Sequence, residues 1–103
     1  MADLPVTNNE AQQRYEVQID GSLAVVQYER RGNEIVLLHT EVPEALEGRG
    51  LGSALARSAL EDARARDLTV VPVCPFVSAY IRKHPGYLAL VAPHHRARLE
   101  PAS

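Results

Sequence analysis

Three of the six glycines in this 103-residue chain, Gly48, Gly50 and Gly52, lie at alternate positions directly before a stretch rich in alanine and leucine. A turn into a helix leaves several backbone N–H groups without partners at the positive end of the helix dipole. Glycine permits positive φ angles there and lets a bulky anion approach the backbone. Residues 47–52 are therefore predicted to bind a phosphate, and the alternative is a turn that only requires flexible residues.

The spacing of these glycines excludes two common phosphate motifs. The loop lacks the G-K-[ST] ending of a P-loop, and its glycines follow G-x-G-x-G where a dinucleotide fingerprint requires G-x-G-x-x-G. ATP and NAD are therefore not favoured as ligands.

Three side chains elsewhere are candidates for catalysis. His39 and Glu41 could each accept a proton. Cys74 directly precedes Pro75 at the expected start of a helix, whose positive end would favour a nucleophilic thiolate. Each residue also has a simpler interpretation: a packed histidine, a solvated glutamate and a cysteine that fills space in the core.

The first elements expected to position these residues are strands. Residues 15–19 and 23–29 have strand composition, and Asp20-Gly21 between them is a hairpin signal. Residues 35–42 form a third predicted strand. Strict alternation would give it one face with Val36, Leu38, Thr40 and Val42, and another face with Leu37, His39 and Glu41.

From Leu51 onward the hydrophobic period becomes helical. The apolar arc of this helix comprises Leu51, Leu55, Ala56, Ala59, Leu60 and Ala63. Residues 69–73 are predicted to form a parallel strand, residues 76–84 a second helix, and residues 87–91 a last short strand. The predicted fold class is α+β (α/β), with a mixed sheet in which antiparallel strands precede a helix, a parallel strand and a helix.

Length and charge limit the possible function classes. The chain suffices for one domain, expected at residues 15–91 between flexible tails at residues 1–14 and 92–103. Its formal charge of -2 provides no positive field for nucleic acid. No apolar run approaches the length of about 20 residues that spans a membrane, so we expect a cytoplasmic protein.

No metal site is expected. Cys74 is the single cysteine, and it has no neighbour with which to complete a zinc site. His94 and His95 are adjacent in a basic segment, but no further ligand is spaced to join them, so they are interpreted as a solvated tail.

The stretch V-P-E-A-L-E-G-R-G-L-G-S-A-L, which begins at Val42, resembles motif A of the GCN5-related N-acetyltransferases, usually written Q/R-x-x-G-x-G/A. Gly50 and Gly52 fall on its two small positions. The span from Tyr15 to Leu90, with HTEVPEAL and VPVCPFVSAYIRKHPGY, is similar to the small, minimal subgroup of this family.

This resemblance implies that amides of the loop bind the pyrophosphate of acetyl-coenzyme A, the cosubstrate. The implied cofactor-binding residues are Val42, Gly48, Arg49, Gly50, Leu51, Gly52 and Ser53. The end of the third strand, Thr40 to Val42, would offer an N–H group to the thioester carbonyl, and His39 or Glu41 would take a proton from the incoming ammonium.

The resemblance also bears on two residues of the second predicted helix. A family cysteine at the position of Cys74 lies close to the thioester, which permits transfer through an acetylated Cys74 as well as direct attack. A family tyrosine on this helix protonates the leaving thiolate, a role that would fall to Tyr80. The alternative for Tyr80 is an aromatic anchor beside Phe76.

Two features depart from the family pattern. Glu47 replaces the arginine or glutamine of motif A, and its carboxylate would repel a pyrophosphate by ~1 kcal/mol unless Arg49 faces inward to offset it. Only a polar segment precedes Tyr15, so the N-terminal family helices that help to form the acceptor pocket are missing.

The sequence therefore predicts an acetyl-coenzyme A-dependent N-acyltransferase that acts on an amine of unknown identity. The alternatives are a coenzyme A-binding module without turnover and a small interaction protein. An exposed sheet edge leaves a homodimer open.

Overall fold

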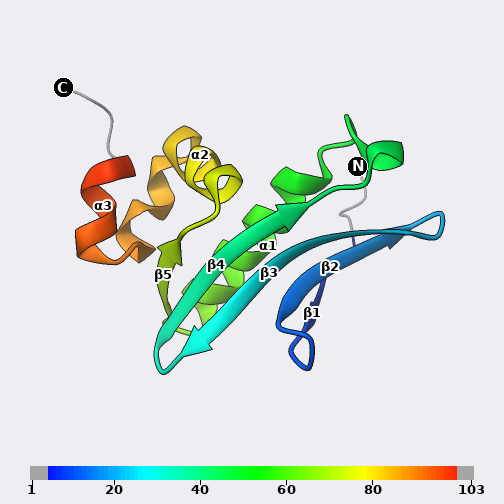
Figure 1. The fold of residues 1–103 in the computed structure, drawn as a ribbon. Coiled ribbons are helices and arrows are strands. Elements are labelled where there is room, and N and C mark those ends of the chain that lie inside the picture. Colours follow the sequence, from blue (N-terminus) through cyan, green and yellow to red (C-terminus); the bar gives the residue numbers. More distant parts are fainter. Residues whose placement is uncertain (1–4, 100–103) are drawn as a thin grey trace.

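A five-stranded sheet forms the centre of the computed structural model, which describes residues 5–99 (Figure 1). The strands lie in chain order, and their bounds are β1 Thr7–Asn9, β2 Arg14–Ile19, β3 Ser22–Arg31, β4 Glu34–Glu41 and β5 Thr69–Pro72. The first four strands are antiparallel neighbours, whereas β5 pairs with β4 in parallel. This mixed sheet confirms the predicted fold class.

Helices cover one face of the sheet. They are α1 Leu51–Ala65, α2 Pro75–Lys83 and α3 Pro93–Leu99, together with the 3-10 helices η1 Glu44–Leu46 and η2 Pro85–Leu90. Figure 1 shows α1 crossing behind the sheet, with α2 and α3 beyond β5. No helix of residues 5–99 lies over the opposite face of β2, β3 and β4, which we call the open face.

The β2–β3 hairpin forms because its two turn residues accept left-handed backbone. Asp20 has a φ of 51° and Gly21 a φ of 79°. A two-residue turn with two positive φ angles matches the right-handed twist of the strands that it joins. The Asp-Gly signal therefore fixes the register in which Ile19 pairs with Ser22.

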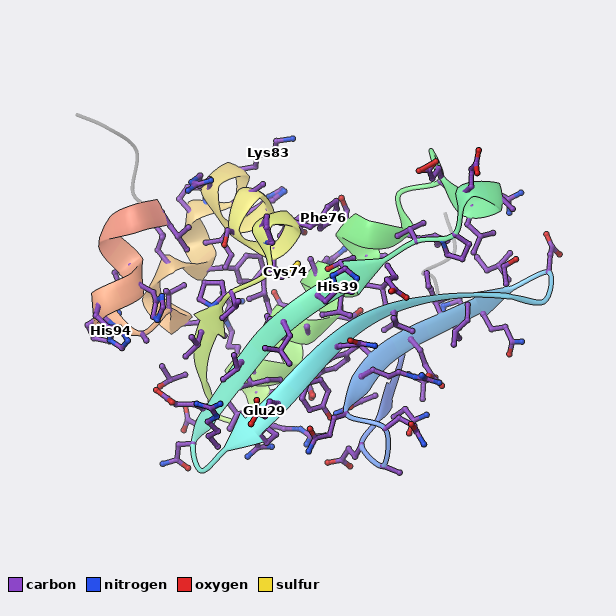
Figure 2. All side chains as sticks on the ribbon, viewed as in Figure 1. Glu29, His39, Cys74, Phe76, Lys83 and His94 are labelled. Carbon is purple, nitrogen blue, oxygen red and sulfur yellow. The ribbon has the colours of Figure 1, made fainter. Side chains whose placement is uncertain are left out.

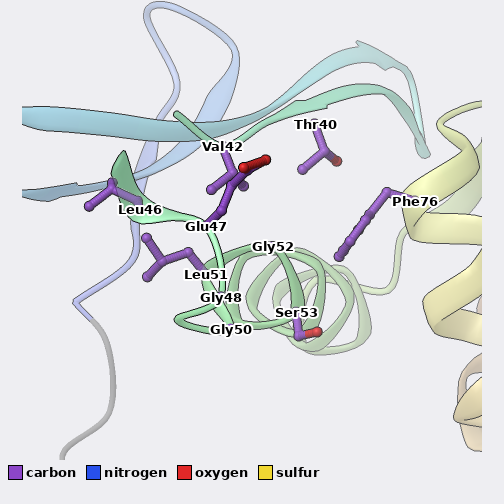
Figure 3. Close-up of a pocket in the computed structure, with 10 residues that line it drawn as sticks. All are labelled: Thr40, Val42, Leu46, Glu47, Gly48, Gly50, Leu51, Gly52, Ser53 and Phe76. Carbon is purple, nitrogen blue, oxygen red and sulfur yellow. The ribbon is translucent and has the colours of Figure 1, made fainter. Parts of the chain in front are cut away.

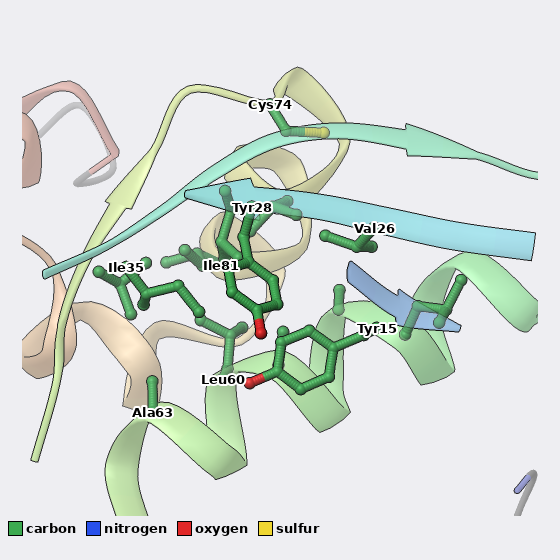
Figure 4. Packing of buried hydrophobic residues seen from close by; sticks show 14 of the residues in the cluster. Tyr15, Val26, Tyr28, Ile35, Leu60, Ala63, Cys74 and Ile81 are labelled. Carbon is green, nitrogen blue, oxygen red and sulfur yellow. The ribbon is translucent and has the colours of Figure 1, made fainter. Parts of the chain in front are cut away.

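Helix α1 packs on the sheet through the arc that its periodicity predicts. Its buried residues are Leu51, Gly52, Leu55, Ala56, Ala59, Leu60 and Ala63. Figure 4 shows Leu60 and Ala63 facing Tyr15, Tyr28 and Ile35 in the core. The small alanines let α1 lie close to the sheet. The larger apolar side chains between them stabilise the fold by about 25 cal/mol per Å² of apolar surface that they remove from water.

A polar network at the edge of the core joins β1 and β2 to α1. The hydroxyl of Tyr15 donates to Asp62 at 2.5 Å, and Nε of Arg66 donates to the other oxygen of Asp62 at 3.1 Å. Asn8 of β1 donates to Asp62 at 3.4 Å and accepts from the hydroxyl of Tyr28 at 2.7 Å. These bonds explain why a polar N-terminal segment is held against the sheet.

Three segments differ from the sequence predictions. Residues 5–14, expected as part of a tail, contain β1, because Asn8 pairs with Tyr15 and joins the network above. Residues 92–99, also expected as a tail, contain α3, whose Leu99 is buried. The predicted strand at residues 87–91 is wrong: Pro85 opens a 3-10 helix, and of these residues Val91 alone bridges to β5.

Two buried tyrosines should make the fold sensitive to alkali. Burial is the main cause that raises the pKa of Tyr15, and the hydrogen bond to Asp62 adds to it. Burial likewise, with the hydrogen bond to Glu61 as the second cause, raises the pKa of Tyr87 to about 12. Folding thus favours the neutral phenols. Their contribution is complete below the unfolded pKa of about 10 and is lost as pH rises through the folded-state values.

We therefore expect the free energy of unfolding, measured in urea, to fall between about pH 10 and about pH 12. The double variant Tyr15→Phe/Tyr87→Phe should show a clearly flatter dependence over the same range. An unchanged slope in that variant would contradict the assignment of alkaline sensitivity to these two residues.

Candidate active site

A β-bulge in β4 decides where the candidate residues point. Tyr28 of β3 pairs with Leu37, whereas the preceding residue, Gln27, pairs with His39. Leu38 is therefore an extra residue in β4. A bulge shifts the alternation of side chains by one position. Thr40 therefore lies opposite the buried Val26 on the helix side of the sheet.

The bulge corrects the predicted faces of this strand. Leu37 is fully buried on the helix side, so it does not share a face with His39 and Glu41, and Thr40 does not share a face with Leu38. The predicted strand was right in extent, but strict alternation could not show the extra residue.

The glycine loop presents unpaired backbone groups at the start of α1. Gly48 and Gly50 have φ angles of 82° and 73°, and Gly50 is the N-cap residue of α1. The first helical bond runs from the N–H of Ala54 to the carbonyl of Gly50 at 3.0 Å. Among the described residues, no hydrogen bond uses the N–H groups of residues 49–53. These groups lie at the positive end of the helix dipole, which suits an anion.

A cavity of about 540 Å³, which we call the loop cavity, lies between this loop, the end of β4 and α2 (Figure 3). It is lined by Thr40, Val42, Leu46, Glu47, Gly48, Gly50, Leu51, Gly52, Ser53 and Phe76. Of the residues predicted to bind the cofactor, all except Arg49 line it. Leu46 and Phe76 were not predicted as binding residues, whereas Glu47 lies in the predicted phosphate loop and Thr40 at the predicted strand end.

The two charged residues of the loop point in different directions. The carboxylate of Glu47 lies at the loop cavity, beside Val42 in Figure 3. The guanidinium of Arg49 instead lies 3.8 Å from the carboxylate of Asp20 in the β2–β3 turn. Arg49 therefore does not face inward to offset Glu47, as the sequence had left open.

Gly52 has a reason of its own to be glycine. A Cβ atom built there would lie 2.7 Å from Cζ of Phe76, whose ring covers this turn of α1. Phe76 is nevertheless 43% exposed, because its other side borders the loop cavity. Its position two residues after Cys74 was the available signal for a role in the site.

Cys74 lies at the N-cap of α2, as predicted, and is buried. Its Sγ is 3.2 Å from Oγ1 of Thr40. The carbonyl of Leu37 accepts from the N–H groups of both Val73 and Cys74, at 3.0 and 2.9 Å, which fixes the start of α2 against β4. Cys74 does not line the loop cavity, so Thr40 is the contact between them.

His39 and Glu41 lie on the open face. His39 Nε2 is 3.3 Å from Oε1 of Glu41, and both side chains are more than half exposed. They line a second cavity of about 380 Å³, the open-face cavity, together with Leu23, Thr40, Val42 and Pro43. Thr40 and Val42, at the end of β4, thus border both cavities.

Tyr80 borders the loop cavity indirectly, through a third cavity that shares Ser53 and Phe76 with it. It lines this third cavity of about 100 Å³ with Ser53, Phe76, Ala79, Lys83 and His84, and its ring stacks on His84 with centroids 4.3 Å apart. In Figure 2, His39, Cys74 and Phe76 lie in one region, where α2 meets β4. The structure therefore brings His39, Glu41 and Cys74 around Thr40 at the end of β4, and it places Tyr80 beside Ser53 and Phe76 of the loop cavity.

Residues 5–99 contain no group of three or more His, Cys, Asp or Glu side chains that could hold a metal ion. His94 and His95 lie in α3, where their rings stack on each other at 4.4 Å. None of the helices described here is long and apolar enough to cross a membrane.

The sequence pattern described as GCN5-related N-acetyl-transferase matches residues 14–91, most of the chain. The chain belongs to the GCN5-related N-acetyltransferase family. Protein NATD1 of Homo sapiens is 33% identical over 99 residues, which cover 93% of this chain and 82% of that protein. Protein NATD1 of Mus musculus is also 33% identical, over 93% of this chain and 84% of that protein.

A solved structure supports the same family. The solution structure of a "GCN5-like putative N-acetyltransferase" from Staphylococcus aureus has a TM-score of 0.67 and 27% identity. The match covers 92% of this chain and 96% of that one. The family fold implies the use of acetyl-coenzyme A, and the residues of the loop cavity fit its diphosphate, because the N–H groups of residues 49–53 are unpaired and the glycines expose them.

Glu47 is the one lining residue that disfavours an anion, so replacing it should strengthen coenzyme A binding. We expect Glu47→Arg to lower the Kd for coenzyme A by roughly fivefold or more at low salt, and by less as salt increases. Isothermal titration calorimetry at two salt concentrations measures both effects.

Glu44→Arg is the matched control, because Glu44 lies in η1, three residues before Glu47, and does not line the loop cavity. Equal tightening in the two variants would show that only the overall charge matters, and that the carboxylate of Glu47 does not act on the bound diphosphate.

Proposed function

We propose that this chain is an acetyl-coenzyme A-dependent N-acyltransferase that acetylates an amine. The observation that carries the proposal is that two cavities share Thr40 and Val42 at the end of β4. One contains the unpaired N–H groups before α1, and the other contains the His39–Glu41 pair. Family membership supports the acyltransferase class, whereas the reaction and its direction rest on this geometry.

The loop cavity would hold the donor. The N–H groups of residues 49–53 would bind the diphosphate, and Val42 and Phe76 provide apolar walls between the loop and the end of β4. Bound acetyl-coenzyme A supplies a thioester, whose acetyl group passes to the amine nitrogen as the carbon–sulfur bond breaks. Thr40, which borders both cavities, lies where the two substrates would meet.

The open-face pair would remove the proton from the acceptor. A glutamate carboxylate can only accept a hydrogen bond, so in the proposed reaction the proton of His39 would lie on Nε2, which is 3.3 Å from Glu41. Nδ1 then remains as the proton acceptor, and Glu41 stabilises the imidazolium that forms. Overall, an ammonium and acetyl-coenzyme A yield an N-acetyl amine, free coenzyme A and one proton.

Transfer through Cys74 is the second route. In that route the thiolate sulfur of Cys74 would accept the acetyl group, coenzyme A would leave as the thiol, and the amine would then displace Cys74. The N-cap position and the contact of Sγ with Thr40 support it. Burial of Cys74 outside the loop cavity favours direct attack, because Thr40 would have to move first.

A coenzyme A-binding module without turnover is the second candidate function. The observation that favours it is the open face, where no helix of residues 5–99 encloses the acceptor side of the His39–Glu41 pair. Such a module would bind coenzyme A at the loop cavity and release no thiol from acetyl-coenzyme A.

Thiol release from acetyl-coenzyme A, measured with a panel of primary amines, tests the proposal. Direct attack predicts that His39→Ala lowers the amine-dependent rate by roughly 10²- to 10⁴-fold, and that Cys74→Ala lowers it less than about tenfold. Transfer through Cys74 predicts loss of activity in Cys74→Ala and an acetyl adduct in the intact mass of the wild type. Coenzyme A binding with no amine-dependent release would support the binding module and contradict the enzyme.

A further inference from the structure

The described residues expose three large apolar side chains. These are Leu38 at 38%, Val73 at 55% and Phe76 at 43% relative exposure. All three lie where β4 and β5 separate: Leu38 in the bulge, Val73 after the end of β5, and Phe76 in the first turn of α2. Phe76 belongs to the loop cavity, but Leu38 and Val73 have no role in the site described above.

Leu38 and Val73 lie at the point where the pairing of β4 and β5 ends. Val71, whose partner in β4 is Val36, faces away from the buried Pro72. Continued alternation would turn Val73 to the same open face, and Val73 also borders a cavity with Pro75, Ser78 and Arg82. The N–H of Val73 donates to the carbonyl of Leu37 at 3.0 Å, which places Val73 beside Leu38 across the strand gap. We call Val36, Leu38, Val71 and Val73 the apolar strip.

The apolar strip adjoins the open-face cavity. Leu38 directly precedes His39, and because the bulge sets both opposite Gln27, they follow each other on the open face. The same surface therefore has an apolar part, the apolar strip, and beside it a polar part with the imidazole of His39 and the carboxylate of Glu41.

The negative charge at this surface is the carboxylate of Glu41, because Glu34 lies at the other end of β4 and Glu47 lines the loop cavity. The side chain of Glu41 is 63% exposed, so its carboxylate retains accepting capacity beyond its contact with His39. A cation is therefore favoured next to the apolar strip.

We propose that the acceptor is a small amphipathic primary amine, whose ammonium group lies at His39 and Glu41 and whose apolar body covers Leu38 and Val73. This inference rests on the proposed function, because it names the substrate class of the same site. The footprint is small: two exposed side chains and a cavity of about 380 Å³ suit a small molecule, whereas a stable protein interface buries about 800 Å² on each partner.

Three probes of equal chain length separate the two parts of this recognition. Hexylamine has both an ammonium group and an apolar body, hexanol lacks the charge, and 1,6-diaminohexane has a second charge at the apolar end. Each is titrated into the ¹⁵N-labelled protein saturated with coenzyme A, which cannot react. We expect hexylamine to shift the amide signals of Leu38, His39, Glu41 and Val73, with a Kd roughly tenfold lower than that of either other probe.

Substitutions in the apolar strip and at Glu41 test which residues cause the preference for hexylamine. Leu38→Asn/Val73→Asn should remove the preference for hexylamine over 1,6-diaminohexane, and Glu41→Gln should remove the preference over hexanol. Glu34→Gln is the matched control, because Glu34 lies on the same strand and face at the other end of β4, and it should change neither preference.

Equal affinity for the three probes, or shifts confined to residues outside the strip and the open-face cavity, would overturn the proposal. The comparison in the wild type decides this even if a variant does not fold. Failure of the proposed function is a different result, in which coenzyme A would not shift the amide signals of residues 49–53. The amine titration could still be carried out on the protein without coenzyme A.

Discussion

One extra residue in β4 determines how the site is assembled. The bulge at Leu38 turns Thr40 to the helix side, where its hydroxyl meets Cys74, and leaves His39 and Glu41 together on the open face. Without it, strict alternation would reverse the faces of the residues that follow Leu38. Because Thr40 and Val42 border both cavities, the bulge also sets the point at which a donor from one side can meet an acceptor from the other.

The backbone at the start of α1 supplies the second half of the site. Positive φ angles at Gly48 and Gly50 turn the chain from η1 into α1, and no hydrogen bond within residues 5–99 uses the N–H groups of residues 49–53. Leu46 and Leu51, which flank the glycines, are buried in the core and hold this loop against the sheet. The carboxylate of Glu47 lies at the loop cavity, and the guanidinium of Arg49 instead lies beside Asp20.

Much of this arrangement could be predicted from the sequence, because it depends on local signals. The Asp20-Gly21 turn, the apolar arc of α1 and the Cys74-Pro75 helix start are each set by neighbouring residues, and the glycine spacing located the loop. The bulge could not be predicted, because it depends on pairing with β3. β1 and α3 were missed for a similar reason, since contacts to distant residues hold polar segments in place.

The most direct test is an amide chemical-shift titration that compares coenzyme A with pantetheine, which lacks the diphosphate. Coenzyme A should shift the signals of residues 49–53 and of Thr40, whereas pantetheine should shift Thr40 with little effect on the loop. Shifts on the open face without any at residues 49–53, or equal effects of the two ligands on the loop, would contradict a donor site built on the unpaired N–H groups before α1.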